Sequence, residues 1–289
     1  MTEQTMTERK IKLIALDLDQ TTLRRDKSLS DRNRNAIEQA IAAGIHVAVA
    51  SGRAFASLPS AVTGIPGLEY AVTSNGAAIY HIPTGKRCQE FPLDPSAVDQ
   101  ILGLVPISLA IEAFWEGRPY GGTDYVANPE AYGAAGSAAA YVKATRTPVP
   151  DIRAFIREHR AHLDALEVIL STLEERDTLW KQLEAAIPEL YITSSAPSLL
   201  ELSQTAGGKR CGLEWLGKKL GILPNEIAAF GDAENDCDMI RYAGLGVAMG
   251  NGHPLLQEAA DMVTVSNEED GVALVIEQIL KGSGQFFIS

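Results

Sequence analysis

Two short apolar runs near the start of the chain end abruptly in polar residues, and this feature limits the possible folds more than any other. Leu13–Leu16 is followed at once by Asp17, and Val47–Ala50 is followed by Ser51. Runs this short and apolar predict buried strands that carry polar groups at their carboxyl ends. Between them, Ser30 is expected to cap a helix. Strand and helix therefore alternate, which predicts parallel strand pairing with right-handed crossovers.

The middle of the chain interrupts this alternation. After Ala78 the residues predict a hairpin that turns at Pro83–Gly85, followed by a helix from Asp94 through Val105. Further elements are expected up to about Ser203, namely strands at Ile107–Ala113, Leu166–Leu170, Leu190–Thr193 and Ser198–Leu202 and helices at Asp151–Glu158 and Glu174–Ala186. From Gly207 the alternation of strands and helices resumes.

The length of 289 residues is enough for two compact domains. We therefore predict an α/β protein whose core is a Rossmann-like, doubly wound parallel sheet, formed by residues 1–83 and 204–289. Residues 84–203 are predicted to form an inserted α+β cap domain.

Three further stretches complete the prediction. Phe55–Val62 is expected to be a helix. The Gly/Ala-rich segment Ala131–Tyr141 predicts either a loosely packed helix or a surface loop. The final residues 281–289 contain glycines and two phenylalanines, and either packing on the body or fraying is compatible with them.

Charge and composition restrict the partners and the location. A net charge of −12 argues against nucleic acid, because binding to its backbone depends on basic patches. The apolar runs are far shorter than the roughly 20 residues of a membrane helix. The polar N-terminus does not resemble a secretory signal, so we expect a cytoplasmic protein with its three scattered cysteines reduced. The substrate is expected to be a small molecule; the oligomeric state stays open.

Asp17 and Asp19 form an acidic pair at i and i+2 just beyond the first buried strand. In an open parallel sheet, ligands bind at this end of the strands, so both carboxylates could face one crevice. For an arbitrary acidic pair a solvated turn is the better interpretation. Three further groups of residues change that balance.

The first two of these groups are suited to anions. Ser51-Gly52 follows a strand and offers a hydroxyl and an amide that can hold phosphate oxygens. Lys209 opens a helix after two glycines, where its ammonium and the helix dipole both favour an anion. Taken alone, Ser51-Gly52 would be explained by a helix cap, and Lys209 by a solvated surface lysine.

The third group gives the strongest local signal, where a strand runs into Gly231-Asp232 and then Asn235-Asp236. Acidic residues packed so densely repel one another unless a cation joins them, and hard oxygen ligands suit Mg²⁺. A calcium-binding EF-hand is excluded, because the loop lacks the alternate ligands and the distant closing glutamate.

These segments resemble the motifs of the haloacid dehalogenase superfamily, in particular its Cof-like phosphatases with a large inserted α+β cap of type IIB. DLDQTTL at 17–23 is similar to the first motif and ASGR at 50–53 to the second. Lys209 corresponds to the third motif, and GDAENDCDMI at 231–240 to the fourth. TSNGA at 73–77, AGLGVAMGNG at 243–252 and SNEEDGVA at 266–273 extend the resemblance over both halves of the core. The family usually has glycine where this chain has Gln20, which is expected to change loop packing or pocket polarity without abolishing the chemistry.

The resemblance implies an enzyme that hydrolyses small phosphomonoesters, such as sugar phosphates. Asp17 is then the nucleophile that forms an aspartyl-phosphate, and Asp19 is the general acid and base. Mg²⁺ is expected on an Asp17 oxygen, the Asp19 main-chain carbonyl and Asp232. Lys209, Ser51, the Gly52 amide and Asn235 are expected to hold the phosphate, with Asp236 in a supporting role.

Other functions stay open from the sequence. A phosphomutase on the same core differs in returning the phosphate to the sugar, and a phospho-aspartate switch uses similar residues without a cap. A silent binding module is disfavoured because both Asp17 and Asp19 are present. In the cap, Trp115, Arg118 and Tyr120 are candidate substrate contacts, although ordinary surface or core positions are the better interpretation of each.

Overall fold

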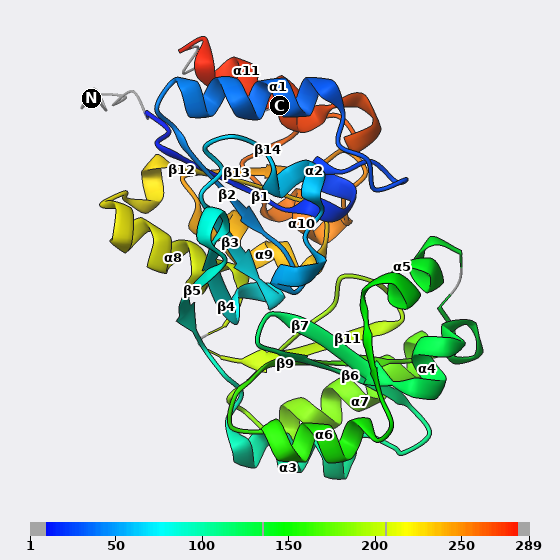
Figure 1. Cartoon of the computed structure of the whole chain (residues 1–289). Helices are drawn as coiled ribbons and strands as arrows, with labels where there is room; N and C mark the ends of the chain where they lie inside the picture. The colour runs from blue at the N-terminus through cyan, green and yellow to red at the C-terminus, as the bar shows by residue number, and fades with distance from the viewer. Residues whose placement is uncertain (1–9, 135, 206, 283–289) are drawn as a thin grey trace.

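The computed structural model describes residues 10–134, 136–205 and 207–282, and in this part of the chain the strands form two sheets (Figure 1). The first sheet, which we call the core sheet, has eight strands in the order β14-β13-β12-β1-β2-β3-β4-β5. Its strands are β1 Leu13–Leu16, β2 His46–Ala50, β3 Tyr70–Thr73, β4 Ala78–His81, β5 Lys86–Glu90, β12 Ile227–Gly231, β13 Leu245–Ala248 and β14 Met262–Val263. The pairs from β14 to β3 are parallel, and β3-β4-β5 form antiparallel pairs.

Helices cover both faces of this core sheet, which confirms the predicted doubly wound α/β class. One face packs against α1 Asp31–Ala42 and α11 Gly271–Leu280. The other face packs against α8 Lys209–Leu220, α9 Cys237–Tyr242 and α10 Pro254–Ala259. Figure 1 shows α1 and α11 together at one side of the sheet and α8 and α9 at the other.

The first crossover shows how local sequence produces this layering. The Ser30 side chain accepts a hydrogen bond from the backbone N–H of Asn33, and so caps α1 as predicted. Ala36, Ile37 and Ala40 are buried on one face of the helix and join the core cluster, since residues three and four positions apart share a helix face. The chain then turns through Gly44, whose φ of 84° favours glycine, into β2.

The second sheet, which we call the cap sheet, has six strands in the order β10-β11-β9-β6-β7-β8. They are β6 Ala110–Trp115, β7 Arg118–Gly122, β8 Thr147–Val149, β9 Leu163–Ile169, β10 Leu190–Thr193 and β11 Leu199–Gln204. Three helices pack on one face of this cap sheet, namely α3 Pro95–Leu104, α6 Ile152–His159 and α7 Leu173–Ala186. In Figure 1 they lie on the side away from the core, so the opposite face of the cap sheet is turned toward the core.

The pairing of β5 bears on the predicted start of the cap. The expected boundary at residue 84 assigns Lys86–Glu90 to the cap, whereas this strand, β5, pairs with β4 in the core sheet. The hairpin turn at Pro83–Gly85 is present, and strand pairing keeps both of its arms in one sheet. We therefore propose that the cap starts after β5.

Several individual elements also differ from expectation. The predicted helix Phe55–Val62 is split into η2 Phe55–Ser57 and α2 Ser60–Thr63, because Pro59 cannot continue a helix and keeps Leu58 extended. The strand expected at Ile107–Ala113 starts three residues later, and β7 and β8 were not predicted. Their sequences, RPYGG and TPV, are rich in proline and glycine, which mask a strand pattern.

The Gly/Ala-rich segment combines both structures that its sequence allows. It holds the short turn η5 Pro129–Tyr132, a bend at Gly133, and helix α5 Ser137–Thr145, preceded by α4 Thr123–Ala127. The expectation for the chain end, residues 283–289, lies outside the described residues. Within the described ranges, no helix has the length and apolar content that crossing a bilayer requires.

Candidate active site

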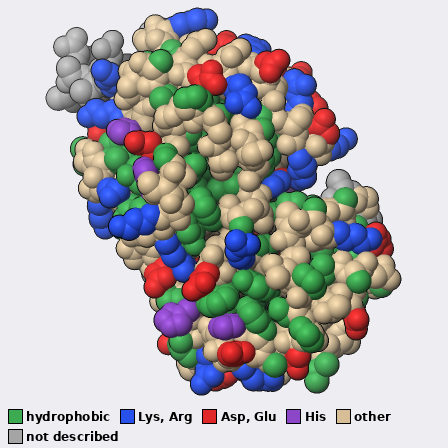
Figure 2. All heavy atoms as spheres, in the orientation of Figure 1, with side chains coloured by type: hydrophobic (Ala, Val, Ile, Leu, Met, Phe, Trp, Pro, Cys, Tyr) green, Lys and Arg blue, Asp and Glu red, His purple; other side chains and the backbone are tan. Residues whose placement is uncertain are grey.

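Three neighbouring strands of the core sheet bring predicted site residues to one edge. β12, β1 and β2 are adjacent and parallel, and they end next to Asp232, Asp17 and Ser51 respectively. A cavity of about 410 Å³ opens at this edge and is lined by both the core and the cap. Its volume falls in the range of small-molecule sites, roughly 300–1,000 Å³. In the outline of Figure 2 the molecule narrows on the right between these two bodies.

Six of the eight predicted site residues line this cavity: Asp17, Asp19, Ser51, Gly52, Asp232 and Asn235. The other two, Lys209 and Asp236, are fully buried behind them. The Lys209 ammonium lies 2.7 Å from Asp17 Oδ1 and 2.6 Å from Asp236 Oδ1. Lys209 therefore acts directly on the Asp17 carboxylate, and its contact with phosphate stays a prediction.

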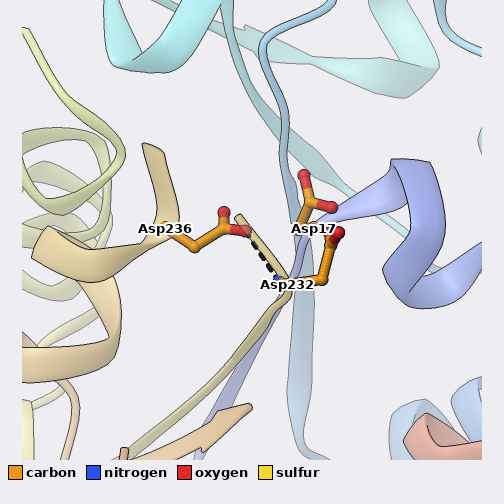
Figure 3. Close-up of side chains that lie close together, drawn as sticks. All are labelled: Asp17, Asp232 and Asp236. Carbon is orange, nitrogen blue, oxygen red and sulfur yellow. Dashed lines mark hydrogen bonds between the residues drawn. The ribbon is translucent and has the colours of Figure 1, made fainter. Parts of the chain in front are cut away.

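Three carboxylates gather around the end of β1, as Figure 3 shows. One oxygen each of Asp17, Asp232 and Asp236 lies within 4.8 Å of the others, and all three side chains are buried. Asp232 Oδ1 also accepts a hydrogen bond of 2.9 Å from the Thr21 hydroxyl. Hard oxygen donors at this spacing fit a divalent cation such as Mg²⁺.

Asp236 differs from the other two carboxylates because its oxygens are already engaged. Oδ1 pairs with Lys209, and Oδ2 accepts hydrogen bonds from the backbone N–H groups of Asp232 at 2.9 Å and Ala233 at 3.1 Å. The bond to Asp232 is the dashed line of Figure 3. This carboxylate holds the loop and the lysine in place, which favours the supporting role expected from the sequence over direct coordination of a metal.

The proton affinities reflect an excess of buried negative charge. Burial, together with the nearby Asp236 and Asp19 carboxylates, raises the pKa of Asp17 to about 7 despite its ion pair with Lys209. Burial and the Asp17 charge likewise hold the pKa of Asp232 well above its usual range. Burial alone would lower the pKa of Lys209, but the two aspartates beside it outweigh that effect and raise it. Three acids beside one ammonium therefore leave a net negative charge that a bound cation can balance.

The Asp19 carboxylate points to a different set of partners. Arg53 holds it through Nε and Nη2, each at 2.7 Å, and the Lys27 ammonium lies 2.6 Å from Oδ1. Burial opposes ionisation, but these two cations outweigh it and lower the pKa of Asp19 to about 2. At neutral pH Asp19 is thus ionised, holds no proton to donate and is a weak base while both cations hold it.

Two of the predicted phosphate-binding residues, Gly52 and Asn235, meet at Asn75. The Asn235 side chain donates a hydrogen bond of 3.0 Å to Asn75 Oδ1. Gly52 faces the same asparagine, and a Cβ at this position would lie about 3.1 Å from Glu201 Oε1 and 3.2 Å from Asn75 Oδ1. Glycine keeps this wall of the cavity open, and Ser51 lies buried beside it.

Some of these residues could have been found in the sequence and others could not. Arg53, Thr21 and Asn75 fall within motifs singled out above, although no role was assigned to them. Lys27 belongs to an exposed loop, and nothing in the sequence connects it to Asp19. Among the cap side chains, Trp115 packs with the helices on the far face of the cap sheet, so the core interpretation holds for it. Neither Arg118 nor Tyr120 is among the residues that line the cavity.

Gln20 adopts a backbone conformation that glycine favours, with φ of 60° and ψ of 7°. Its side chain is exposed at the cavity mouth, so little packing depends on it. We expect Gln20→Gly to raise the free energy of unfolding by up to about 1 kcal/mol, because left-handed geometry strains a residue with a Cβ. Urea denaturation of both proteins measures this difference. A loss of more than about 1 kcal/mol would show that the Gln20 side chain stabilises the loop.

Comparisons with known proteins identify the family to which the chain is similar. Residues 14–276 match a family model described as haloacid dehalogenase-like hydrolase. The chain is 32% identical over 287 residues to phosphatase YwpJ of Bacillus subtilis, an alignment that covers 93% of this chain and 100% of the relative. It is 30% identical to the B. subtilis 5-amino-6-(5-phospho-D-ribitylamino)uracil phosphatase YcsE, with 92% and 94% covered. A solved haloacid dehalogenase-like hydrolase from B. subtilis superposes with a TM-score of 0.79 at 29% identity, over 92% of this chain and 99% of that one.

Proposed function

Since this chain belongs to the haloacid dehalogenase-like hydrolases, in their Cof-like branch, we propose that it is a Mg²⁺-dependent phosphatase that hydrolyses small phosphomonoesters through a phosphorylated Asp17. The observation that carries the proposal is the position of Asp17. Its carboxylate lies at the floor of a cavity that both domains line, next to Lys209 and within reach of Asp232.

Asp17 is proposed to attack the phosphorus atom of the substrate. A bond forms between a carboxylate oxygen and phosphorus, the ester P–O bond breaks, and the alcohol leaves with a proton. Water then attacks the aspartyl-phosphate, which releases inorganic phosphate and restores the Asp17 carboxylate. The ion pair with Lys209 keeps Asp17 oriented and reduces the repulsion between the carboxylate and the anionic substrate.

A divalent cation fits the acidic cluster described above. Asp17, Asp232 and the main-chain carbonyl of Asp19 would hold it, because Asp236 is already occupied by Lys209 and two backbone amides. When bound, Mg²⁺ neutralises charge that develops on the phosphoryl group. Ser51, the Gly52 amide and Asn235 line the same cavity and are proposed to hold the remaining phosphate oxygens.

Asp19 is proposed to move the protons of both steps. With a pKa of about 2 it is ionised but a weak base, so partial release from Arg53 and Lys27, which raises that pKa, must accompany its acceptance of a proton from the attacking water in the second step. To protonate the leaving alcohol in the first step, it must first be released in part from Arg53 and Lys27. Substrates with good leaving groups do not need that protonation.

The metal requirement tests the proposal most directly. We expect purified protein to release phosphate from p-nitrophenyl phosphate with Mg²⁺, and to lose at least about 100-fold in rate when a chelator removes the metal, since such ions contribute several kcal/mol to transition-state stabilisation. Mg²⁺ should also raise the melting temperature, because it relieves repulsion between buried carboxylates. Asp232→Asn should lose most of this thermal shift. Full turnover without metal would rule the proposal out.

A phosphomutase on the same core is the alternative to be excluded by product analysis. Phosphatase action gives one inorganic phosphate for each ester consumed, whereas a mutase moves the phosphate to another position of the sugar. The same assay tests a phospho-aspartate switch, which would take up one phosphate per molecule and then stop.

A further inference from the structure

Three glutamates lie side by side on the face of the cap sheet that lines the cavity. Glu201 of β11 pairs with Glu167 of β9, and Glu167 pairs with Glu112 of β6. Residues paired directly across neighbouring strands place their side chains on the same face of a sheet. We refer to Glu112, Glu167 and Glu201 as the glutamate row. All three line the cavity that also contains Asp17.

The alternation of side chains along the strands fixes this orientation. The neighbours of the row, such as Ile111, Leu166 and Leu200, belong to the cluster that packs under α3, α6 and α7. Because successive residues of a strand point to opposite faces, the row points the other way, toward the core. In Figure 1 those helices lie on the side of the cap sheet away from the core.

The glutamate row is unfavourable for the fold itself. Its members are at most 6% exposed, and like charges directly opposite each other on neighbouring strands repel. Arg146 is the cation that pairs with the row, at 2.7 Å from Glu112 and 3.4 Å from Glu167. Burial accordingly raises the pKa of Glu167 well above its usual range and also raises that of Glu201. Apolar residues would satisfy the packing of this sheet face at lower cost.

Two oxygen atoms of the row lack a hydrogen-bond partner among the described residues. They are Glu112 Oε1 and Glu201 Oε2, and both are buried. The same carboxylates have other contacts: Arg146 binds Glu112 Oε2 and the Tyr125 hydroxyl also pairs with Glu112. The Ser195 hydroxyl donates to Glu201 Oε1, and the Asn75 amide also pairs with Glu201. Buried acceptors without donors are costly, so acceptors that line a cavity indicate a ligand that supplies donors.

We propose that the glutamate row binds the alcohol part of the substrate through that part's hydroxyl or ammonium hydrogens, and that it excludes leaving groups that carry a carboxylate. This inference rests on the proposed phosphatase function. The row accepts hydrogen bonds and cannot balance another negative charge, because Glu112 and Glu167 share one guanidinium and Glu201 is held by hydrogen bonds from Ser195 and Asn75. The core residues proposed to hold phosphate line the same cavity, and Glu201 lies beside one of them, Gly52, whereas Glu112 and Glu167 pair with Arg146.

Matched substrate pairs test the charge rule. Glucitol 6-phosphate and 6-phosphogluconate differ by a terminal alcohol against a carboxylate, as do glycerol 1-phosphate and 3-phosphoglycerate. We expect kcat/KM to favour the alcohol of at least one pair by roughly 10- to 100-fold, the factor that corresponds to one hydrogen bond to a charged group. A comparison of kcat/KM for glucosamine 6-phosphate and glucose 6-phosphate separates the two kinds of hydrogen-bond donor. A tenfold preference for the amine identifies an ammonium as the donor to the row, and equal rates identify hydroxyls.

Glu167→Gln tests the row itself, because it removes one charge at constant size and leaves the Glu112–Arg146 pair in place. The alcohol-to-carboxylate preference should fall at least tenfold. The melting temperature at pH 8 should rise by roughly 2–4 °C as repulsion is relieved. Glu184→Gln, an exposed position on α7 at the opposite face of the sheet, is the matched control and should change neither value.

Specific results would overturn the inference. The first is equal rates for both members of each substrate pair, and the second is an unchanged alcohol-to-carboxylate preference in a folded Glu167→Gln variant. The third is a lowered melting temperature of that variant, which would assign Glu167 a purely structural role. Activity on p-nitrophenyl phosphate without activity on any of these metabolites would also overturn it. Absence of activity on every ester, p-nitrophenyl phosphate included, would instead contradict the proposed function.

Discussion

Asp17→Asn is expected to abolish turnover, with kcat for p-nitrophenyl phosphate reduced by at least about 1,000-fold. The amide is nearly the same size as the carboxylate but is a poor nucleophile, and it cannot form the acyl phosphate. It also removes the ion pair with Lys209. The measurement is steady-state release of p-nitrophenolate and of phosphate at saturating Mg²⁺.

The control for this experiment is Asp26→Asn. Asp26 lies in an exposed loop, where its carboxylate accepts hydrogen bonds from Ser28. The same chemical change there should leave kcat within about twofold, since surface substitutions have small effects. Thermal melting of both variants separates loss of the nucleophile from loss of the fold. Normal kcat in a pure Asp17→Asn preparation would exclude the aspartyl-phosphate mechanism.

Asp19→Asn is expected to separate the two chemical steps. p-Nitrophenolate leaves without a proton donor, so Asp17 should still be phosphorylated. Hydrolysis of the phosphoenzyme needs a base and should slow by roughly 100- to 10,000-fold. The expected result is a burst of about one p-nitrophenolate per active site, followed by slow turnover, with phosphate retained on the protein.

Rapid-mixing kinetics and intact-protein mass spectrometry measure this burst. Asp17→Asn serves as the negative control, because it should give neither a burst nor a mass increase. The Asp19 substitution also leaves Arg53 and Lys27 without their shared carboxylate, so the melting temperature must be recorded. Equal slowing of both phases, with no accumulated phosphoenzyme, would argue that Asp19 positions Arg53 and transfers no proton.

The core fold was predictable because it follows from local patterns. Leu13–Leu16 and Val47–Ala50 have the length and apolar content of buried strands, and the Ser30 cap sets the start of α1. The cap was less predictable, because β7 and β8 contain proline and glycine and their pairing depends on distant strands. The assignment of β5 to the core sheet is likewise a matter of pairing, which the sequence of a single hairpin does not specify.

The sequence by itself determined which chemical groups stand at the ends of the core strands. Acidic, hydroxyl and amide residues follow apolar runs there, and parallel pairing brings those ends to one edge. Asp17 and Asp232 meet for this reason, because they follow the parallel neighbours β1 and β12. The candidate nucleophile and the acidic cluster could therefore be inferred from residue types and their order.

The tertiary structure alone decided what these groups contact. Lys27 and Arg53 hold Asp19, Asp236 is occupied by backbone amides, and the glutamate row arises from the register of three cap strands. The physical reason is that charges are tuned by neighbours and burial. Both depend on which strands pair and in which register, and neither is encoded within a short segment.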